Sequence, residues 1–143
     1  MNWLNIATLG PIGYLPAPGT CATIVTLLLV YGLKNTNNIV YLSLLVIIFL
    51  IGLKAADDAV HILRDTDPSC VVIDESIGTL ITFIGVPINI TTLIVGFLLF
   101  RFFDISKWFG IARLQQLPSP WGVIMDDVVA GLFSCLLLHV LHV

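Results

Sequence analysis

Two pairs of adjacent acids stand out in a chain that carries few charges. Asp74-Glu75 and Asp126-Asp127 each follow three apolar residues, and each leads into an apolar segment with a glycine about one helical turn further on, at Gly78 and Gly131. Because residues i and i+4 share one face of a helix, each glycine is expected to lie on the face of an acid of its pair. A glycine there lets another helix or a ligand come close to the carboxylate.

The two pairs predict a site for a hard metal ion. Carboxylates that come together repel one another and raise one another's pKa unless a cation lies among them. Oxygen ligands without a Cys or His companion suit Mg²⁺ or Mn²⁺ better than Zn²⁺. The alternative is that acids at helix starts interact with the helix dipole and cap the first turn. We favour a metal site because charge is costly to bury near lipid and the pattern occurs twice.

A third set of charged residues has helical spacing. Arg101, Asp104 and Lys107 follow one another at i, i+3 positions and would line one stripe of a helix. Two cations beside a carboxylate could hold a phosphate next to a metal. A ladder of ion pairs on a helix surface explains the spacing equally well.

The segment from Gly10 to Thr20 is too rich in Gly and Pro to be helical. Thr20 is placed to cap the helix that follows, and backbone N–H groups at such a helix start can bind a phosphate. The segment has no GK[ST] ending, so it is not a P-loop. On these residues alone, a capping turn is the favoured interpretation.

The composition argues against an ordinary water-soluble domain. The chain has 143 residues, of which 58% are hydrophobic and 10% charged, compared with about 45–50% and about 25% in an average soluble domain. Its mean hydropathy is +1.05. The length suits one domain over 1–143. The formal net charge of -3 excludes the basic surface that binds nucleic acid, so no nucleic-acid partner is expected.

Four apolar segments predict the helices that must position these residues, at about 21–33, 39–53, 77–100 and 128–143. The second is the best candidate to cross a bilayer. A separate amphipathic helix is predicted within the polar stretch 54–75, ending near Asp67-Pro68.

The segment 77–100 carries Pro87 at its centre, where a proline interrupts helical hydrogen bonding. A kinked span or a helical hairpin is expected. Only a hairpin would return the chain to the same side and bring Asp104 to the acid pairs. We predict an all-α fold: a compact helical bundle, membrane-associated or integral, with a Pro-broken central hydrophobic segment.

Four blocks of the chain, in this order, resemble the bacterial phosphatidylglycerophosphatase A family: Pro18-Gly19-Thr20, then Asp67-Pro68-Ser69 with Val72-Ile73-Asp74-Glu75 and Gly78, then Phe100-Arg101-Phe102-Phe103-Asp104 with Lys107, then Gly122-Val123-Ile124-Met125-Asp126-Asp127 with Ala130-Gly131. The resemblance implies a small helical, Mg²⁺-dependent phosphatase that converts phosphatidylglycerophosphate to phosphatidylglycerol in phospholipid biosynthesis. It also implies the bacterial inner (cytoplasmic) membrane, with the active site facing the cytoplasm.

The chain departs from the family in two places. Ala22-Thr23 stands where the family usually has Gly-Ser, and Trp108-Phe109-Gly110 stands where it usually has Pro-x-Pro. The acids are intact. These changes leave the metal site credible and leave open a different substrate preference.

Our leading hypothesis is hydrolysis of a lipid phosphomonoester at the membrane interface. The predicted metal ligands, for one or two Mg²⁺ ions, are Asp74, Glu75, Asp104, Asp126 and Asp127. Four of these, Asp74, Glu75, Asp104 and Asp127, are also predicted to be catalytic, and the residues predicted to bind the anionic phospholipid substrate are Thr20, Arg101 and Lys107.

The residues leave the nucleophile and the function class open. Water is the simplest nucleophile, and an aspartate is the other. The alternative function is a small membrane cation carrier or channel subunit that uses the same carboxylates. Arg101 and Lys107 argue against it, because fixed cations suit an anionic phosphate better than a path for free cations. The oligomeric state is not predicted.

Overall fold

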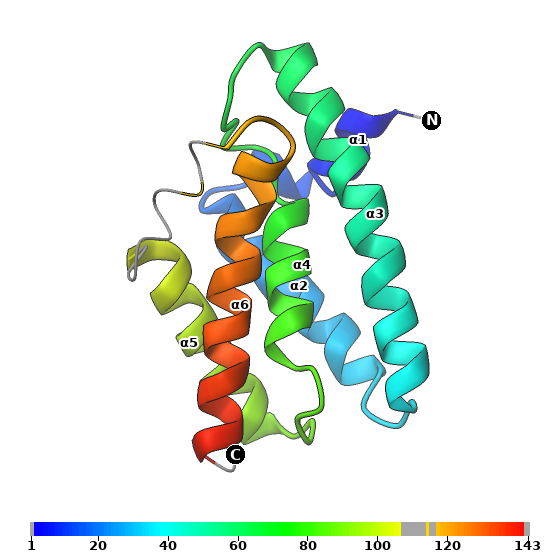
Figure 1. The fold of residues 1–143 in the computed structure, drawn as a ribbon, viewed down its shortest axis with the longest axis vertical. Helices are drawn as coiled ribbons and strands as arrows, with labels where there is room; N and C mark the ends of the chain where they lie inside the picture. Colours follow the sequence, from blue (N-terminus) through cyan, green and yellow to red (C-terminus); the bar gives the residue numbers. More distant parts are fainter. Residues whose placement is uncertain (1, 107–113, 115–116, 142–143) are drawn as a thin grey trace.

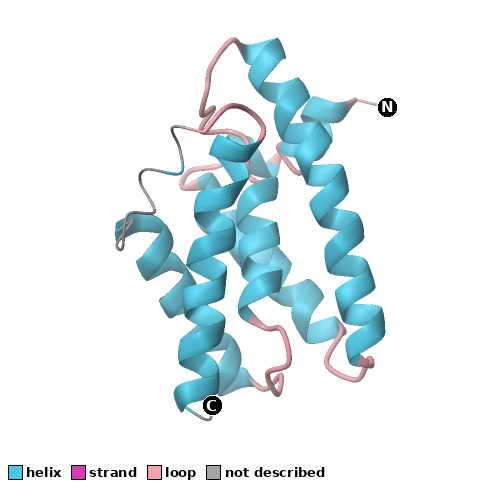
Figure 2. Ribbon diagram, in the orientation of Figure 1, coloured by secondary structure: helices cyan, strands magenta, loops and turns pink. Residues whose placement is uncertain are grey.

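A computed structural model describes residues 2–106, 114 and 117–141 (Figure 1). Every regular element in these residues is helical (Figure 2), which confirms the predicted all-α class. In chain order the elements are α1 (Trp3–Ala7), the 3₁₀ helix η1 (Ile12–Tyr14), α2 (Pro18–Gly32), α3 (Asn38–Leu63), α4 (Ile73–Thr82), α5 (Ile90–Ser106) and α6 (Trp121–Leu141).

The short helix α4 lies at the centre of the bundle. It packs most extensively against α6 and also contacts α2 and α3 (Figure 1). Every residue of α4 except Glu75 is buried. Two hydrogen bonds tie the outer helices to it: the Thr26 hydroxyl of α2 donates to Ser76 Oγ at 2.8 Å, and the Tyr41 hydroxyl of α3 donates to the Leu80 carbonyl at 2.7 Å. The core of the molecule is therefore built around α4.

The contact between α4 and α6 depends on two glycines. A Cβ atom at Gly78 would lie only 2.6 Å from the carbonyl oxygen of Asp127, and a Cβ at Gly131 would collide with the carbonyl oxygen of Gly78. A helix or a ligand was expected beside these two glycines, and the structure shows a helix. Each glycine admits the backbone of the other helix.

The segment around Pro87 folds back as a helical hairpin. Residues 83–89 form a loop between α4 and α5, and α5 returns toward the end of the bundle at which α4 begins (Figure 1). Asn89 caps the N-terminus of α5, because its side chain accepts a hydrogen bond from the Thr92 N–H at 2.9 Å. The hairpin places Asp74-Glu75 and Asp104 at the same end of the molecule.

Several predicted boundaries were wrong. The separate amphipathic helix does not exist, because α3 continues without a break to Leu63 and ends at Arg64 in the left-handed conformation. The continuation is stabilised by burial of one face, since Ala55, Ala56 and Ala59 are fully buried.

Two helix starts also differ from expectation. Helix α2 begins at Pro18, where proline is well tolerated, so Thr20 lies within the first turn and does not cap the helix. Helix α6 begins at Trp121, so Asp126-Asp127 lie beyond its first turn, whereas Asp74-Glu75 do lie in the first turn of α4. Interaction with the helix dipole can therefore explain only one of the two acid pairs.

The outer faces of the bundle are apolar. By length and composition, α3 and α6 are each long and apolar enough to cross a membrane. Large side chains such as Val46 and Leu50 of α3 and Leu132 and Leu136 of α6 are exposed. Exposed apolar surface on this scale marks contact with a membrane or a partner. These features are those of a membrane-associated protein.

The close contact of α4 and α6 can be tested with Gly131→Ala. The added methyl group would overlap the Gly78 backbone, so we expect the free energy of unfolding in detergent to fall by about 1–3 kcal/mol. Gly32→Ala is the matched control, because Gly32 is also helical and a Cβ there meets nothing within 4 Å. Equal stability of the two variants would contradict the close contact.

Candidate active site

A polar pocket of about 290 Å³ opens at the end of the bundle where α4 and α6 begin and α5 ends. The described residues that line it include six carboxylates and one guanidinium. The lining residues are Ala17, Pro18, Gly19, Asp67, Pro68, Ser69, Val71, Asp74, Glu75, Arg101, Asp104, Asp126 and Asp127. Such an excess of negative charge would favour a bound cation.

Three of the carboxylates lie close enough together to share one ion. Asp74 and Glu75 of α4 and Asp127 of α6 each offer an oxygen, and these atoms all lie within 4.8 Å of one another. Asp74 is 8% exposed and Asp127 is 3% exposed. Among the described residues, neither Oδ1 of Asp74 nor Oε2 of Glu75 has a hydrogen-bond partner. Buried carboxylate oxygens without partners fit a metal site, because such atoms are otherwise costly to bury.

The electrostatics of the pocket agree with its geometry. Burial, together with the nearby charges of Glu75 and Asp127, raises the pKa of Asp74 well above its usual range. Burial also raises the pKa of Glu75. A divalent cation would reverse this effect, since it favours the ionised form of each carboxylate that it contacts.

Local structure explains how α4 presents its acids. The segment before α4 is held to the N-terminal region, because the Val72 N–H donates to the Ala7 carbonyl at 2.9 Å. Asp74 and Glu75 follow at once in the first turn of α4. The contact of Gly78 with the α6 backbone then sets the distance between this turn and Asp127.

Helix α5 contributes the positively charged side chain that lines the pocket in the described residues, Arg101. The Arg101 guanidinium donates through Nη1 to Asp104 Oδ2 at 2.5 Å, and the two side chains are only 16% and 13% exposed. The pair therefore faces the pocket, which excludes the alternative of a solvent-exposed ladder for these two residues. Among the described residues, Arg101 Nε is buried without a partner.

The start of α2 closes the pocket from the other side. A Cβ atom at Gly19 would lie 3.2 Å from Arg101 Nη1 and would collide with the Glu75 carboxylate. The Gly19 backbone thus approaches both the cation and one of the acids. A larger residue at this position would have to displace the ends of the Glu75 and Arg101 side chains.

Of the predicted site residues, six come together in the pocket: Asp74, Glu75, Arg101, Asp104, Asp126 and Asp127. Thr20 is half-buried and does not line the pocket, because the chain presents Pro18 and Gly19 there instead. Lys107 lies outside the described residues.

Sequence reasoning assigned no role to three lining residues, Gly19, Asp67 and Ser69. The only signal for them was their presence in the blocks Pro18-Gly19-Thr20 and Asp67-Pro68-Ser69. Asp67 and Ser69 lie in a loop, which has no periodicity that points to a ligand, and Gly19 has no side chain.

Ala22 and Thr23, which replace the usual Gly-Ser of the family, lie behind the pocket. Both residues are fully buried, and the Thr23 hydroxyl donates to the Gly19 carbonyl at 2.8 Å. Neither residue lines the pocket, and the Thr23 hydrogen bond connects this position to Gly19, which does. The second departure, Trp108-Phe109-Gly110, lies outside the described residues.

Comparison with known proteins supplies the family. Residues 5–142 match the family model described as phosphatidylglycerophosphatase A. A Bacteroides thetaiotaomicron protein provisionally named phosphatidylinositol-3-phosphatase is 35% identical over 136 residues, covering 90% of this chain and 86% of the relative. Phosphatidylglycerophosphatase A of Haemophilus influenzae is 30% identical, covering 89% and 80%. Phosphatidylglycerophosphatase A of Escherichia coli is 31% identical, covering 71% and 57%.

No solved structure matches the chain. The family model nevertheless covers almost the whole chain, including all four blocks that carry the acids and Arg101. The chain therefore belongs to the phosphatidylglycerophosphatase A family and is a phosphatase.

Proposed function

We propose that this protein is an Mg²⁺-dependent hydrolase that converts phosphatidylglycerophosphate to phosphatidylglycerol and inorganic phosphate. The observation that carries the proposal is the gathering of Asp74, Glu75 and Asp127 within 4.8 Å, in the pocket that also contains Arg101. Carboxylates beside a guanidinium can hold a cation and a phosphate next to each other. The names of the Haemophilus and Escherichia relatives suggest the lipid.

The donor set fits magnesium. Asp74, Glu75 and Asp127 would hold the ion, and Asp104 and Asp126 line the same pocket and could support a second one. All of these ligands are hard oxygens, and two of the oxygens have no partner in the described structure. When bound, Mg²⁺ polarises the phosphate and lowers the pKa of an attacking water.

The protein's own groups would position the phosphate. Arg101 would donate to its non-bridging oxygens, since phosphoryl transfer depends mainly on positioning and charge compensation. Asp104 would hold the guanidinium in place through the hydrogen bond to Nη1. The close backbone of Gly19 would limit the position of the phosphate from the α2 side.

Hydrolysis needs no reactant other than water and the lipid. A bond forms between the water oxygen and phosphorus, and the bond between phosphorus and the glycerol oxygen breaks. One water proton ends on the glycerol oxygen. Direct attack by water needs fewer steps than a covalent aspartyl intermediate and is the route that we propose.

A second lipid is also a candidate substrate. The Bacteroides relative carries the name of a phosphatidylinositol-3-phosphatase, so phosphatidylinositol-3-phosphate is the second candidate substrate. Both lipids are phosphomonoesters, and they differ in the alcohol that leaves. Turnover of the two lipids in the same detergent micelles would decide between them. Faster hydrolysis of the inositol lipid would overturn our choice of substrate.

We further propose that the pocket faces the cytoplasm from the bacterial inner membrane. Helix α3 ends toward the pocket end of the bundle and has Arg64 as its C-cap, and Arg101 lines the pocket. Lys34 follows α2, which ends at the opposite end of the bundle. An excess of basic residues on one side favours the cytoplasmic side. The cation-carrier alternative gains nothing from the comparisons, because the relatives are named as phosphatases.

Metal dependence is the first test of the proposal. EDTA should abolish release of inorganic phosphate from phosphatidylglycerophosphate, because the clustered carboxylates would lose the cation that offsets their charge. Added Mg²⁺ should restore the activity. EDTA already saturated with Mg²⁺ is the control and should have no effect. Full activity in free chelator would exclude the proposed mechanism.

The substitution Asp127→Asn keeps the shape of the side chain and removes a ligand charge. We expect kcat to fall at least ~10²-fold, equivalent to ~2.7 kcal/mol of transition-state stabilisation. Asp58→Asn is the matched control, because Asp58 pairs with Lys54 on the surface of α3 and does not line the pocket. Near-normal turnover of Asp127→Asn would show that Asp127 is not a ligand of the catalytic metal.

A further inference from the structure

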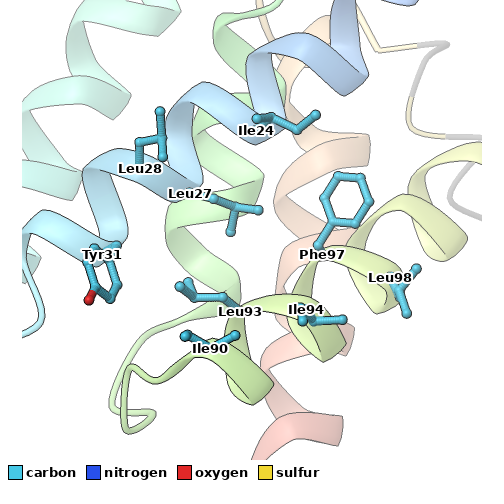
Figure 3. A pocket seen from close by; sticks show the side chains of 9 residues that line it. All are labelled: Ile24, Leu27, Leu28, Tyr31, Ile90, Leu93, Ile94, Phe97 and Leu98. Atoms are coloured by element: carbon cyan, nitrogen blue, oxygen red, sulfur yellow. The ribbon is translucent and has the colours of Figure 1, made fainter.

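An apolar groove of about 550 Å³ lies between α2 and α5 (Figure 3). Helix α2 contributes Ile24, Leu27, Leu28 and Tyr31, and α5 contributes five side chains between 90 and 98. Apart from the hydroxyl group of Tyr31, all of these side chains are hydrocarbon. Figure 3 shows Leu27 and Tyr31 of α2 pointing toward α5, and Phe97 of α5 pointing toward α2.

The same two helices connect this groove to the polar pocket. On α2, Gly19 lines the pocket and Ile24 lines the groove, and the two are separated by a rise of ~7.5 Å along the helix axis, at 1.5 Å per residue. On α5, Leu98 lines the groove and Arg101 lines the pocket, a separation of ~4.5 Å. The groove therefore begins beside the proposed phosphate site and leads away from it.

We propose that the groove holds one acyl chain of the substrate while the phosphate lies in the polar pocket. This inference rests on the proposed function and adds the site that recognises the lipid tail. From Ile24 to Tyr31 the groove follows α2 for ~10 Å, which compares with ~15 Å for one leaflet of a bilayer's hydrocarbon core. Its length thus suits a large part of one chain.

The groove would help catalysis mainly by orienting the lipid, and much less by the hydrophobic free energy of transferring its tail. A lipid tail is already surrounded by hydrocarbon in the membrane, so its entry into an apolar groove gains little hydrophobic free energy. Close contacts with the groove would instead align the lipid and hold its phosphate against Arg101. We therefore expect the acyl chain to affect the rate of phosphate release.

The test compares dipalmitoyl and dihexanoyl phosphatidylglycerophosphate in the same mixed micelles. The groove variant is Ile94→Trp, and the matched control is Val46→Trp on the outer face of α3, since the two native side chains are 55% and 54% exposed. The wild type should prefer the long chains. In Ile94→Trp the ratio of long- to short-chain kcat/KM should fall roughly tenfold, or ~1.4 kcal/mol, whereas Val46→Trp should keep the wild-type ratio.

Leu98→Trp, one turn nearer to Arg101, should repeat the shift and serves if Ile94→Trp does not fold. An unchanged ratio in the groove variants, or an equal fall in Val46→Trp, would overturn the proposal in favour of unspecific contact with lipid. A ratio that depends on protein concentration would overturn it in favour of a second copy of the chain.

Failure of the wild type to hydrolyse either lipid would contradict the proposed function itself. The groove is then tested with a brominated acyl chain on phosphatidylglycerophosphate and the fluorescence of Tyr31→Trp, which replaces one aromatic side chain of the groove wall by another and leaves the groove open. Quenching beyond that of the wild type and of Val46→Trp supports the groove. Quenching equal to that of Val46→Trp overturns it.

Discussion

Close packing of α4 on α6 forces acidic side chains together inside an apolar bundle. At Gly78 and Gly131 the two backbones meet without intervening side chains, so the acids one turn away cannot separate without breaking the core. Asp74, Glu75 and Asp127 are consequently held within 4.8 Å of one another. Their mutual repulsion opposes this packing, and a bound cation would turn the repulsion into attraction. The proposed metal site and the core of the protein thus depend on the same contact.

This arrangement divides the molecule along its length. One end carries the polar pocket, and the apolar groove begins a short distance away between the same helices, α2 and α5. A phospholipid has the same division between its phosphate and its tails. The bundle would therefore offer each part of the proposed substrate a surface of matching polarity, and Gly19 and Arg101 line the pocket on the same two helices that form the groove.

Much of the site was predictable from local patterns. The i, i+4 relation of each acid pair to a glycine and the proline at 87 indicated that distant carboxylates would gather, and five acids and Arg101 do line one pocket. The sequence could not show that Gly78 and Gly131 face each other, because that is a tertiary contact. It also suggested a false break in α3, where buried alanines continue one helix through a charged stretch. Asp67 and Ser69 were missed because loop residues follow no period.

Direct binding of Mn²⁺, used in place of Mg²⁺ and followed by its electron paramagnetic resonance signal, tests the shared site most directly. The wild type should bind the ion in detergent without any substrate. Asp74→Asn on α4 and Asp127→Asn on α6 should each raise Kd at least ~tenfold, equivalent to ~1.4 kcal/mol, because both carboxylates would ligate the same ion. Wild-type affinity in either variant would show that the two helices do not share a cation and would contradict the account.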